Sequence, residues 1–357
     1  MSHYDIEPEI FTGNIFIFFA FDVGDDIDFT GITRQQDIVT QQVHLPKFFK
    51  NYHTPLFIEL PHPHTTSTCI DSKVHPFGTI SLRYKIPFNT TLKDLHQELI
   101  KIDEKYQEQS IADAYSIFKK IKHHIDKAHF FQLRTYYTVI QVDTKKTLTG
   151  PELKEKYSND IATLLRFETQ TLSEFHKEEI LESSVGYFKK DLIVIDTEAA
   201  FMYDPQYEEL LYFFEFGNIQ QLELQYFDRL LDQQLTTIYN YNKPRNVPFM
   251  SYLPIIGSRY FDPVEELTRL KVDISVITER LENSIKLVGE TYFSDIYQLI
   301  VEKLDIKQWQ ASIDTKFNVI KEIRYHYQNK IDATRNDLLS ILIIILITLE
   351  LIIALYK

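Results

Sequence analysis

The sequence predicts an α+β fold: a mixed N-terminal domain, then a long antiparallel helical hairpin and a single C-terminal transmembrane helix. Segments with the period of strands alternate irregularly with segments that have the period of helices, and no strand–helix unit repeats. Two long stretches with apolar residues every three or four positions follow, which is the coiled-coil-like pattern of paired helices. The last segment, residues 338–356, is apolar over almost its whole length.

The N-terminal α+β domain is expected to occupy residues 1–242. Its predicted strands are rich in β-branched and aromatic residues, and its predicted helices have apolar residues at helical spacing. The strands are Ile15–Phe21, Leu56–Leu60, Thr79–Ile86, Tyr136–Val142, Leu192–Asp196 and Ala200–Tyr203. The helices are Leu92–Lys105, Ile111–Ala128, Pro151–Phe167 and Tyr207–Tyr239.

A proline-bearing linker, residues 243–262, separates this domain from the predicted hairpin at residues 263–337. The first hairpin helix begins at Pro263, with Asp262 as its N-cap. The second begins near Gln308 and meets the apolar C-terminal run with no proline or glycine in between, so one continuous helix is expected from there through the membrane.

The C-terminal run reads LLSILIIILITLELIIALY from residue 338 to residue 356, close to the roughly 20 helical residues that a bilayer core requires. A buried core helix is the alternative, but such a helix is rarely apolar on every face. A lone span at this position predicts a tail-anchored, single-pass membrane protein. The acidic first residues do not fit a secretory signal or a mitochondrial presequence.

Basic residues near the span predict its orientation. Segments rich in Lys and Arg beside a membrane span stay on the cytoplasmic side. The N-terminal domain is therefore expected in the cytoplasm, at the inner membrane if the host is bacterial. The basic residues before the span are Lys321, Arg324, Lys330 and Arg335, and only Lys357 follows it. Glu350 is the one charge inside the span, where it either extends toward the far interface or bonds another helix.

Composition excludes several classes of protein. The chain has 357 residues with a net charge of −13, which argues against general nucleic-acid binding through surface charge. It has 9 glycines, too few for a turn-dense all-β barrel. Its one cysteine, Cys69, excludes an internal disulfide framework.

No local motif identifies an enzyme or a cofactor site. Phosphate-binding Gly-x-x-x-x-Gly-Lys, Gly-x-Ser-x-Gly and His-Glu-x-x-His are all absent, although catalytic groups can also assemble in space. Four residues could ligate zinc, but their spacing matches no familiar finger and nearby prolines indicate a loop, so no metal or other cofactor is expected. They are His62, His64, Cys69 and His75.

The most unusual segment is a strongly apolar helix around residues 215–232 with one polar stripe. Polar side chains recur there every three or four positions, so they share one helix face. They are Asn218, Gln221, Gln225, Asp228 and Asp232. The stripe is either a solvent-exposed edge or a polar seam hydrogen-bonded to neighbouring elements or to a ligand.

This helix and the terminal span resemble the "required for meiotic nuclear division" (Rmd/YagE-type) family. The family helix reads Leu-Ala-Gln-Ser-x-x-Leu-x-x-Phe-Glu with an acid four positions later, and the residues in register here are Gln220, Leu224, Phe227, Asp228 and Asp232. Gln221 stands in place of the family serine, and Glu223 in place of a common basic residue. The family span ends Ile-Glu, which Leu349–Glu350 matches, but its start, Arg-Leu-Glu-Trp, differs from residues 337–340.

The resemblance implies a membrane-attached, oligomer-forming protein without an established catalytic activity. The mitochondrial role of some family members, support of organelle translation, does not transfer, because several motif positions differ. Combining these observations, we expect a non-enzymatic tether or scaffold that contacts the lipid bilayer, forms homo-oligomers and binds further protein partners. The alternative is a membrane-bound enzyme or small-ligand-binding module with its site on the 218–232 helix face.

Overall fold

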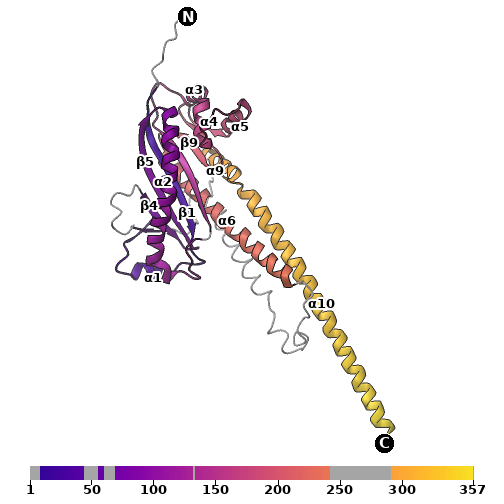
Figure 1. The fold of residues 1–357 in the computed structure, drawn as a ribbon. Helices are drawn as coiled ribbons and strands as arrows, with labels where there is room; N and C mark the ends of the chain where they lie inside the picture. Colours follow the sequence, from indigo (N-terminus) through magenta and orange to yellow (C-terminus); the bar gives the residue numbers. More distant parts are fainter. Residues whose placement is uncertain (1–8, 44–54, 60–68, 132, 242–290, 357) are drawn as a thin grey trace. The chain divides into compact units, whose positions relative to one another are not determined.

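A computed structural model describes residues 9–43, 55–59, 69–131, 133–241 and 291–356 (Figure 1). They form two compact units, which are described separately. The first contains the described residues up to 226 together with 291–309, and the second contains 227–241 and 310–356. The boundary between the units therefore falls inside two helices, α6 (Tyr207–Tyr241) and α10 (Ile306–Leu355).

The described part of the first unit is built on a nine-stranded sheet in the order β2-β3-β4-β5-β1-β6-β9-β8-β7. Neighbouring strands are antiparallel except β6 and β9, which are parallel. The strands are β1 (Phe11–Asp22), β2 (Thr40–Gln42), β3 (Leu56–Ile58), β4 (Cys69–His75), β5 (Thr79–Thr90), β6 (Arg134–Val142), β7 (Ser184–Val185), β8 (Leu192–Ile195) and β9 (Ala199–Tyr203).

Strand β1 lies at the centre, paired with β5 on one side and β6 on the other. Its sequence is apolar at consecutive positions because both faces of the sheet are covered. Ile15, Ile17 and Phe19 point into the main hydrophobic core, whereas Phe16 and Phe18 alternate with them and are buried on the opposite face.

The main core lies between one face of the sheet and a layer of helices, chiefly α2 and α4. Within the described residues, the helices other than α6, α9 and α10 are α1 (Phe29–Arg34), α2 (Leu92–Ile121), the 3₁₀ helix η1 (Lys122–His124), α3 (Gly150–Lys156), α4 (Ser158–Arg166) and α5 (Glu174–Glu182). The other face is covered by α6, where the Phe214 ring stacks on Tyr137 of β6 with 5.5 Å between ring centroids.

Helix α9 (Thr291–Lys303) packs along the first half of α6. The rings of Phe213 and Phe293 are 5.7 Å apart, and Tyr297 Oη donates a hydrogen bond to Gln220 Oε1 at 2.9 Å. A Cβ on Gly217 would lie 2.5 Å from Ile300 Cγ2, so glycine permits this close approach. Residues further along α6 contact residues further along α9, so the two helices are parallel.

The second unit repeats this parallel pairing between the end of α6 and α10. Ser312 Oγ donates to Asp228 Oδ1 at 2.7 Å, and Lys316 Nζ lies 2.8 Å from both Asp228 Oδ1 and Asp232 Oδ2. Asp232 lies four residues after Asp228 on α6, and its partner Lys316 lies four residues after Ser312 on α10, so the two helices are parallel. Leu231 and Ile313 are buried in this unit, so apolar packing accompanies the ion pairs.

The α+β class and the C-terminal apolar helix are confirmed, and α10 is one continuous helix as expected from about Gln308 onward. The antiparallel hairpin is not confirmed: most of its first helix, like the linker 243–262, lies outside the described residues, and the hairpin stays a prediction. Within the described residues, α9 and α10 each pair with α6.

Local periodicity misplaced several elements. The helices predicted over Leu92–Lys105 and Ile111–Ala128 are one helix, α2. The polar stretch between them is also helical, because it buries Tyr106 and Ser110 on the same face. The helix predicted over Pro151–Phe167 divides at Tyr157 into α3 and α4. Strands β2, β4 and β7 and helices α1 and α5 were not predicted.

Reversing the charge of Lys316 should loosen the α6–α10 pair. Lys316→Glu would place three carboxylates together where the side chains are partly exposed, a change worth about 1 kcal/mol. We expect amide hydrogen exchange in residues 227–236 to become about fivefold faster.

Lys321→Glu is the matched control, because Lys321 is an exposed lysine on the same helix. Unchanged exchange in residues 227–236 of Lys316→Glu would contradict the pairing.

Candidate functional site

Polar side chains line the part of the sheet that α6 covers. On β4 they are Asp71, Lys73 and His75, and on β5 they are Thr79, Ser81 and Arg83. Strand pairing sets Asp71 against Arg83, Lys73 against Ser81 and His75 against Thr79. The alternate residues Val74, Ile80 and Leu82 enter the main core on the other face. Period-two alternation therefore gathers the polar groups under α6.

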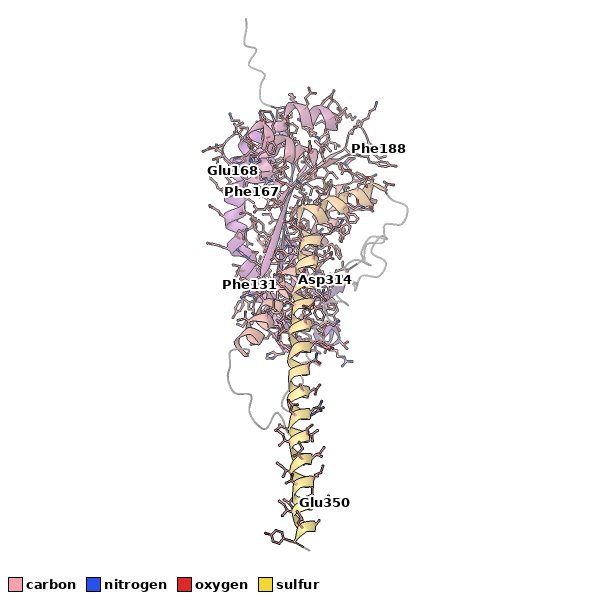
Figure 2. All side chains as sticks on the ribbon, turned by 90° about the vertical axis from the view of Figure 1, so that its right-hand side faces the viewer. Phe131, Phe167, Glu168, Phe188, Asp314 and Glu350 are labelled. Atoms are coloured by element: carbon pink, nitrogen blue, oxygen red, sulfur yellow. The ribbon has the colours of Figure 1, made fainter. Side chains whose placement is uncertain are left out.

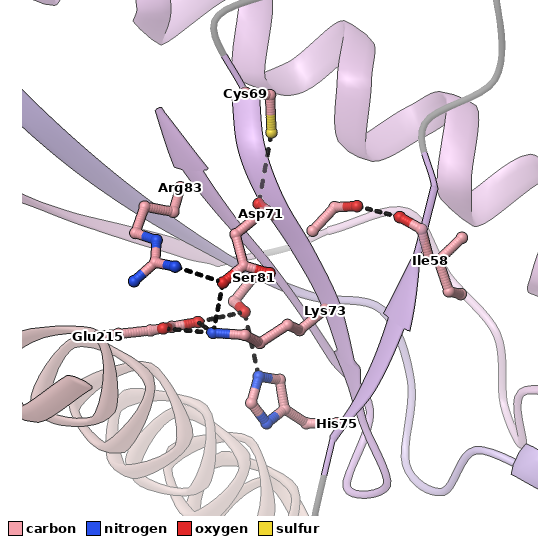
Figure 3. A network of polar contacts seen from close by, with 9 residues as sticks. Ile58, Cys69, Asp71, Lys73, His75, Ser81, Arg83 and Glu215 are labelled. Atoms are coloured by element: carbon pink, nitrogen blue, oxygen red, sulfur yellow. Dashed lines mark hydrogen bonds and ion pairs between the residues drawn. The ribbon is translucent and has the colours of Figure 1, made fainter. Parts of the chain in front are cut away.

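A buried ion pair between β4 and α6 forms the centre of this site (Figure 3). Lys73 Nζ donates to Glu215 Oε1 at 2.9 Å and to Oε2 at 2.7 Å. The same ammonium lies 2.8 Å from Asp71 Oδ2, which also accepts from Arg83 Nη2 at 2.7 Å. Two cations thus face two carboxylates, and their charges balance.

Further groups complete the network. Ser81 Oγ donates to Glu215 Oε1 at 3.0 Å, and His75 Nε2 lies 3.1 Å from Ser81 Oγ. The ring of Tyr212, one turn before Glu215, lies under both cations, 5.2 Å from Lys73 Nζ and 5.7 Å from the Arg83 guanidinium carbon. These cation–π contacts help to replace the water that the cations lose on burial.

The protonation states follow from these contacts. Burial opposes the charge on Glu215, but Lys73 and Arg83 outweigh it and lower the pKa of Glu215 to about 2. Burial likewise opposes the charge on Lys73, but Glu215 and Asp71 outweigh it and raise the Lys73 pKa. Burial lowers the pKa of His75 to about 3, so the imidazole stays neutral. A lysine held as ammonium is not a nucleophile, so the network is suited to fixing α6 on the sheet.

A cavity of about 320 Å³ lies at the outer end of the network. Its wall is formed by strands β1, β4 and β5 and by the first two turns of α6. Arg83 and Tyr212 belong both to the network and to the wall. The cavity is the part of this site that a small molecule can enter.

A second buried carboxylate, Glu223, lies two turns further along α6. Thr79 Oγ1 donates to Glu223 Oε1 at 2.5 Å. Burial and the nearby charges of Asp22 and Asp25 raise the pKa of Glu223 to about 8, although the Thr79 hydrogen bond opposes the shift. Glu223 is therefore largely protonated at neutral pH, unlike Glu215 on the same helix.

The predicted polar stripe does not gather into one concave site. Asn218 is buried, and within the described residues its Oδ1 has no hydrogen-bond partner. Gln221 Nε2 donates to the Leu304 carbonyl at the end of α9, at 3.4 Å. Asp228 and Asp232 bind Lys316 on α10, and Gln225 is half-buried. Gln221, Asp228 and Asp232 thus form a seam to neighbouring helices.

Cys69 and His75, the two candidate zinc ligands within the described residues, do not converge. Cys69 begins β4 and His75 ends it, which separates them by about 20 Å at the rise of a strand. Burial raises the pKa of the Cys69 thiol to about 12. His62 and His64 lie outside the described residues, and within those residues no three His, Cys, Asp or Glu side chains are arranged to hold a metal ion.

Comparison with known proteins assigns the sheet to a family. Residues 12–209, more than half of the chain, match the family described as "Uncharacterized protein MJ0711, N-terminal domain". The chain belongs to this family. The match begins in β1 and ends in the first turn of α6, so it includes Lys73 and Arg83 but stops before Glu215.

The relative "Uncharacterized protein MJ0711" of Methanocaldococcus jannaschii is 25% identical over 272 residues, which cover 73% of this chain and 76% of the relative. No solved structure matches the chain. Neither finding tests the Rmd/YagE resemblance, which stays a prediction.

Lys73, Arg83 and Glu215 were missed by the sequence analysis. The signal was present in TISLRYK, where polar residues alternate with apolar ones as in a strand with one polar face, and it was weaker in DSKVH, where Ser72 interrupts the alternation. Glu215 stands alone among aromatic residues in YFFEF, where a carboxylate needs a buried partner. Lys73 and Glu215 are 142 residues apart, so neither local segment shows that the two side chains pair.

Removing Glu215 should destabilise the fold strongly. Glu215→Ala leaves the buried Lys73 and the partly buried Arg83 with one carboxylate between them, and breaking a buried pair costs about 3–5 kcal/mol. Chemical denaturation of the full chain in detergent would measure the loss in free energy of unfolding.

Glu178→Ala, at an exposed position of α5, is the matched control and should change stability by less than about 0.5 kcal/mol. The network would not stabilise α6 on the sheet if the two variants were equally stable.

Glu223 should make stability depend on pH in the opposite sense to Glu215. Between its ordinary pKa of 4.5 and about 8, the folded chain keeps a proton that the unfolded chain has released, so stability falls as pH rises through this window. Glu223→Gln removes this contribution and should be roughly 1–3 kcal/mol more stable than the unaltered chain at pH 8.5, but similar to it at pH 4.5.

Denaturation curves of both proteins at the two pH values would measure the difference, in which other titrating groups cancel. A difference that does not change between the two values would show that Glu223 is not protonated by folding.

Proposed function

We propose that this protein is a single-span membrane protein that acts as a non-enzymatic tether or scaffold. The observation that carries the proposal is helix α10, whose segment Arg335–Leu355 has 21 residues with a mean hydropathy of 3.0. No part of this apolar segment is buried within the described residues. Figure 2 shows side chains projecting around the helix near Glu350.

Apolar side chains on every face of an exposed helix need an apolar environment. Ile344, Leu346 and Ile353 are each more than half exposed, and such surface costs about 25 cal/mol per Å² in water. A lipid bilayer would cover all faces at once, whereas a protein groove would cover one. The excess of Lys and Arg before the span supports a cytoplasmic sheet domain.

The tethering role is supported by the fact that the buried and half-buried charged groups of α6 are already paired with other residues of the chain. The Lys73–Glu215 network is balanced in charge, and Asp228 and Asp232 are paired with Lys316. These groups connect α6 to the sheet and to α10, and they leave little capacity for chemistry on a substrate. Homo-oligomer formation through the hairpin and the span is part of this proposal, together with further protein partners. Glu350 either extends toward the far interface or bonds a neighbouring helix.

A small-ligand-binding module is the second candidate. The observation that favours it is the cavity beside Arg83 and Tyr212. This cavity lies at the first turns of α6, and not on the 218–232 face that the sequence indicated.

Membrane attachment should depend on the apolar part of α10. We expect the full chain to float with lipid vesicles in a density gradient and to stay bound at high salt and alkaline pH. A chain ending at Asn336 should stay at the bottom of the gradient, because it lacks the apolar segment.

Glu350→Leu keeps the apolar length and should float like the unaltered chain. A full chain that separates from vesicles without detergent would overturn both the span and the tethering role.

A further inference from the structure

The cavity beside the ionic network is large enough to hold a small molecule. Its volume of about 320 Å³ lies at the lower end of the range for ligand pockets. A β-bulge helps to form it: Cys69 pairs with Tyr84 and Asp71 with Arg83, so Ile70 is the extra residue on β4. Bulges redirect side chains, and Ile70 lines the cavity with 48% of its surface exposed.

Part of the cavity wall is apolar and aromatic. Phe16 of β1 and Leu211 of α6 line the cavity with Ile70. The ring of Tyr207 packs against Phe16 with 5.9 Å between centroids. An apolar side chain of a ligand would bury its surface here.

Strand β5 supplies donors with unused capacity. Arg83 Nη2 is bound to Asp71, but within the described residues the buried Nε has no hydrogen-bond partner. Lys85, two positions further on the same face, has its ammonium 5.8 Å from the Phe16 ring centroid and no ion pair in the described chain. The side chains of Arg83 and Lys85 both line the cavity, and guanidinium and ammonium groups are donors suited to a carboxylate.

The first turn of α6 supplies the opposite charge. Glu208 and Glu209 line the cavity, are exposed, and have no ion pair within the described part of the chain. They would repel a ligand that carries only negative charge, such as phosphate. They would attract an ammonium group.

We infer that this cavity binds a free α-amino acid with an apolar side chain. The ligand carboxylate meets the Arg83 guanidinium and the Lys85 ammonium, and the ligand ammonium meets Glu208 or Glu209. The side chain lies against Phe16 and Ile70. A zwitterion of this kind uses both signs of charge and the apolar wall, whereas a simple anion or a neutral apolar molecule uses only part of the site. The inference does not depend on membrane attachment or tethering.

Titration calorimetry on the full chain in detergent micelles tests this assignment. Leucine, methionine and phenylalanine are the probes, and N-acetylleucine and leucine amide are matched compounds that lack one charge each. We expect at least one probe to bind, and leucine to bind at least tenfold more tightly than either blocked compound.

Variants at the cavity rim test the two ends separately. Lys85→Met should weaken leucine binding about tenfold, and the double variant Glu208→Gln/Glu209→Gln should do the same, without affecting the buried network. Lys101→Met and Glu98→Gln, at exposed positions of α2, are the matched controls and should bind leucine like the unaltered chain.

Three results would overturn the inference: no binding of any probe, blocked compounds that bind as tightly as leucine, or acetate binding as tightly as leucine. None of these results would affect vesicle flotation, so failure here is distinguishable from failure of the tethering proposal.

Discussion

The ion pair between Lys73 and Glu215 is the contact on which the described structure depends most. Apolar contacts between α6 and the sheet are non-directional, and they would tolerate a shift of α6 along the strands. A buried ammonium tolerates only the position at which a carboxylate reaches it. Glu215 therefore sets the place of α6 on the sheet of the first unit, where α9 also packs along α6.

The same pair shapes the neighbouring cavity. Because Lys73 and Arg83 are balanced by Asp71 and Glu215, the charges that remain at the rim are those of Lys85, Glu208 and Glu209. A scaffold needs only the fixed position of α6, whereas a ligand site needs the unpaired rim charges as well. The two proposals thus share Arg83 but otherwise rest on different residues of one arrangement.

The elements with strong local periodicity could be predicted from sequence, and those held by distant partners could not. Strands β1, β5 and β6 and helices α6 and α10 are long and apolar at the right spacing. Strand β4 contains Asp71 and Lys73, which resemble loop residues until Glu215 is placed beside them. Asp228 and Asp232 of the polar stripe lie on α6, but their partner Lys316 lies more than 80 residues away and has no local signature.

The parallel arrangement of α6 and α9 has a consequence for biosynthesis. Phe213 and Phe216 are covered in part by Phe293 and Tyr297, which leave the ribosome about 80 residues later. At about 5–20 residues per second, this aromatic surface waits roughly 4–16 s for its cover. During that interval the nascent chain exposes an aromatic face of α6, and we expect a holding chaperone to bind it.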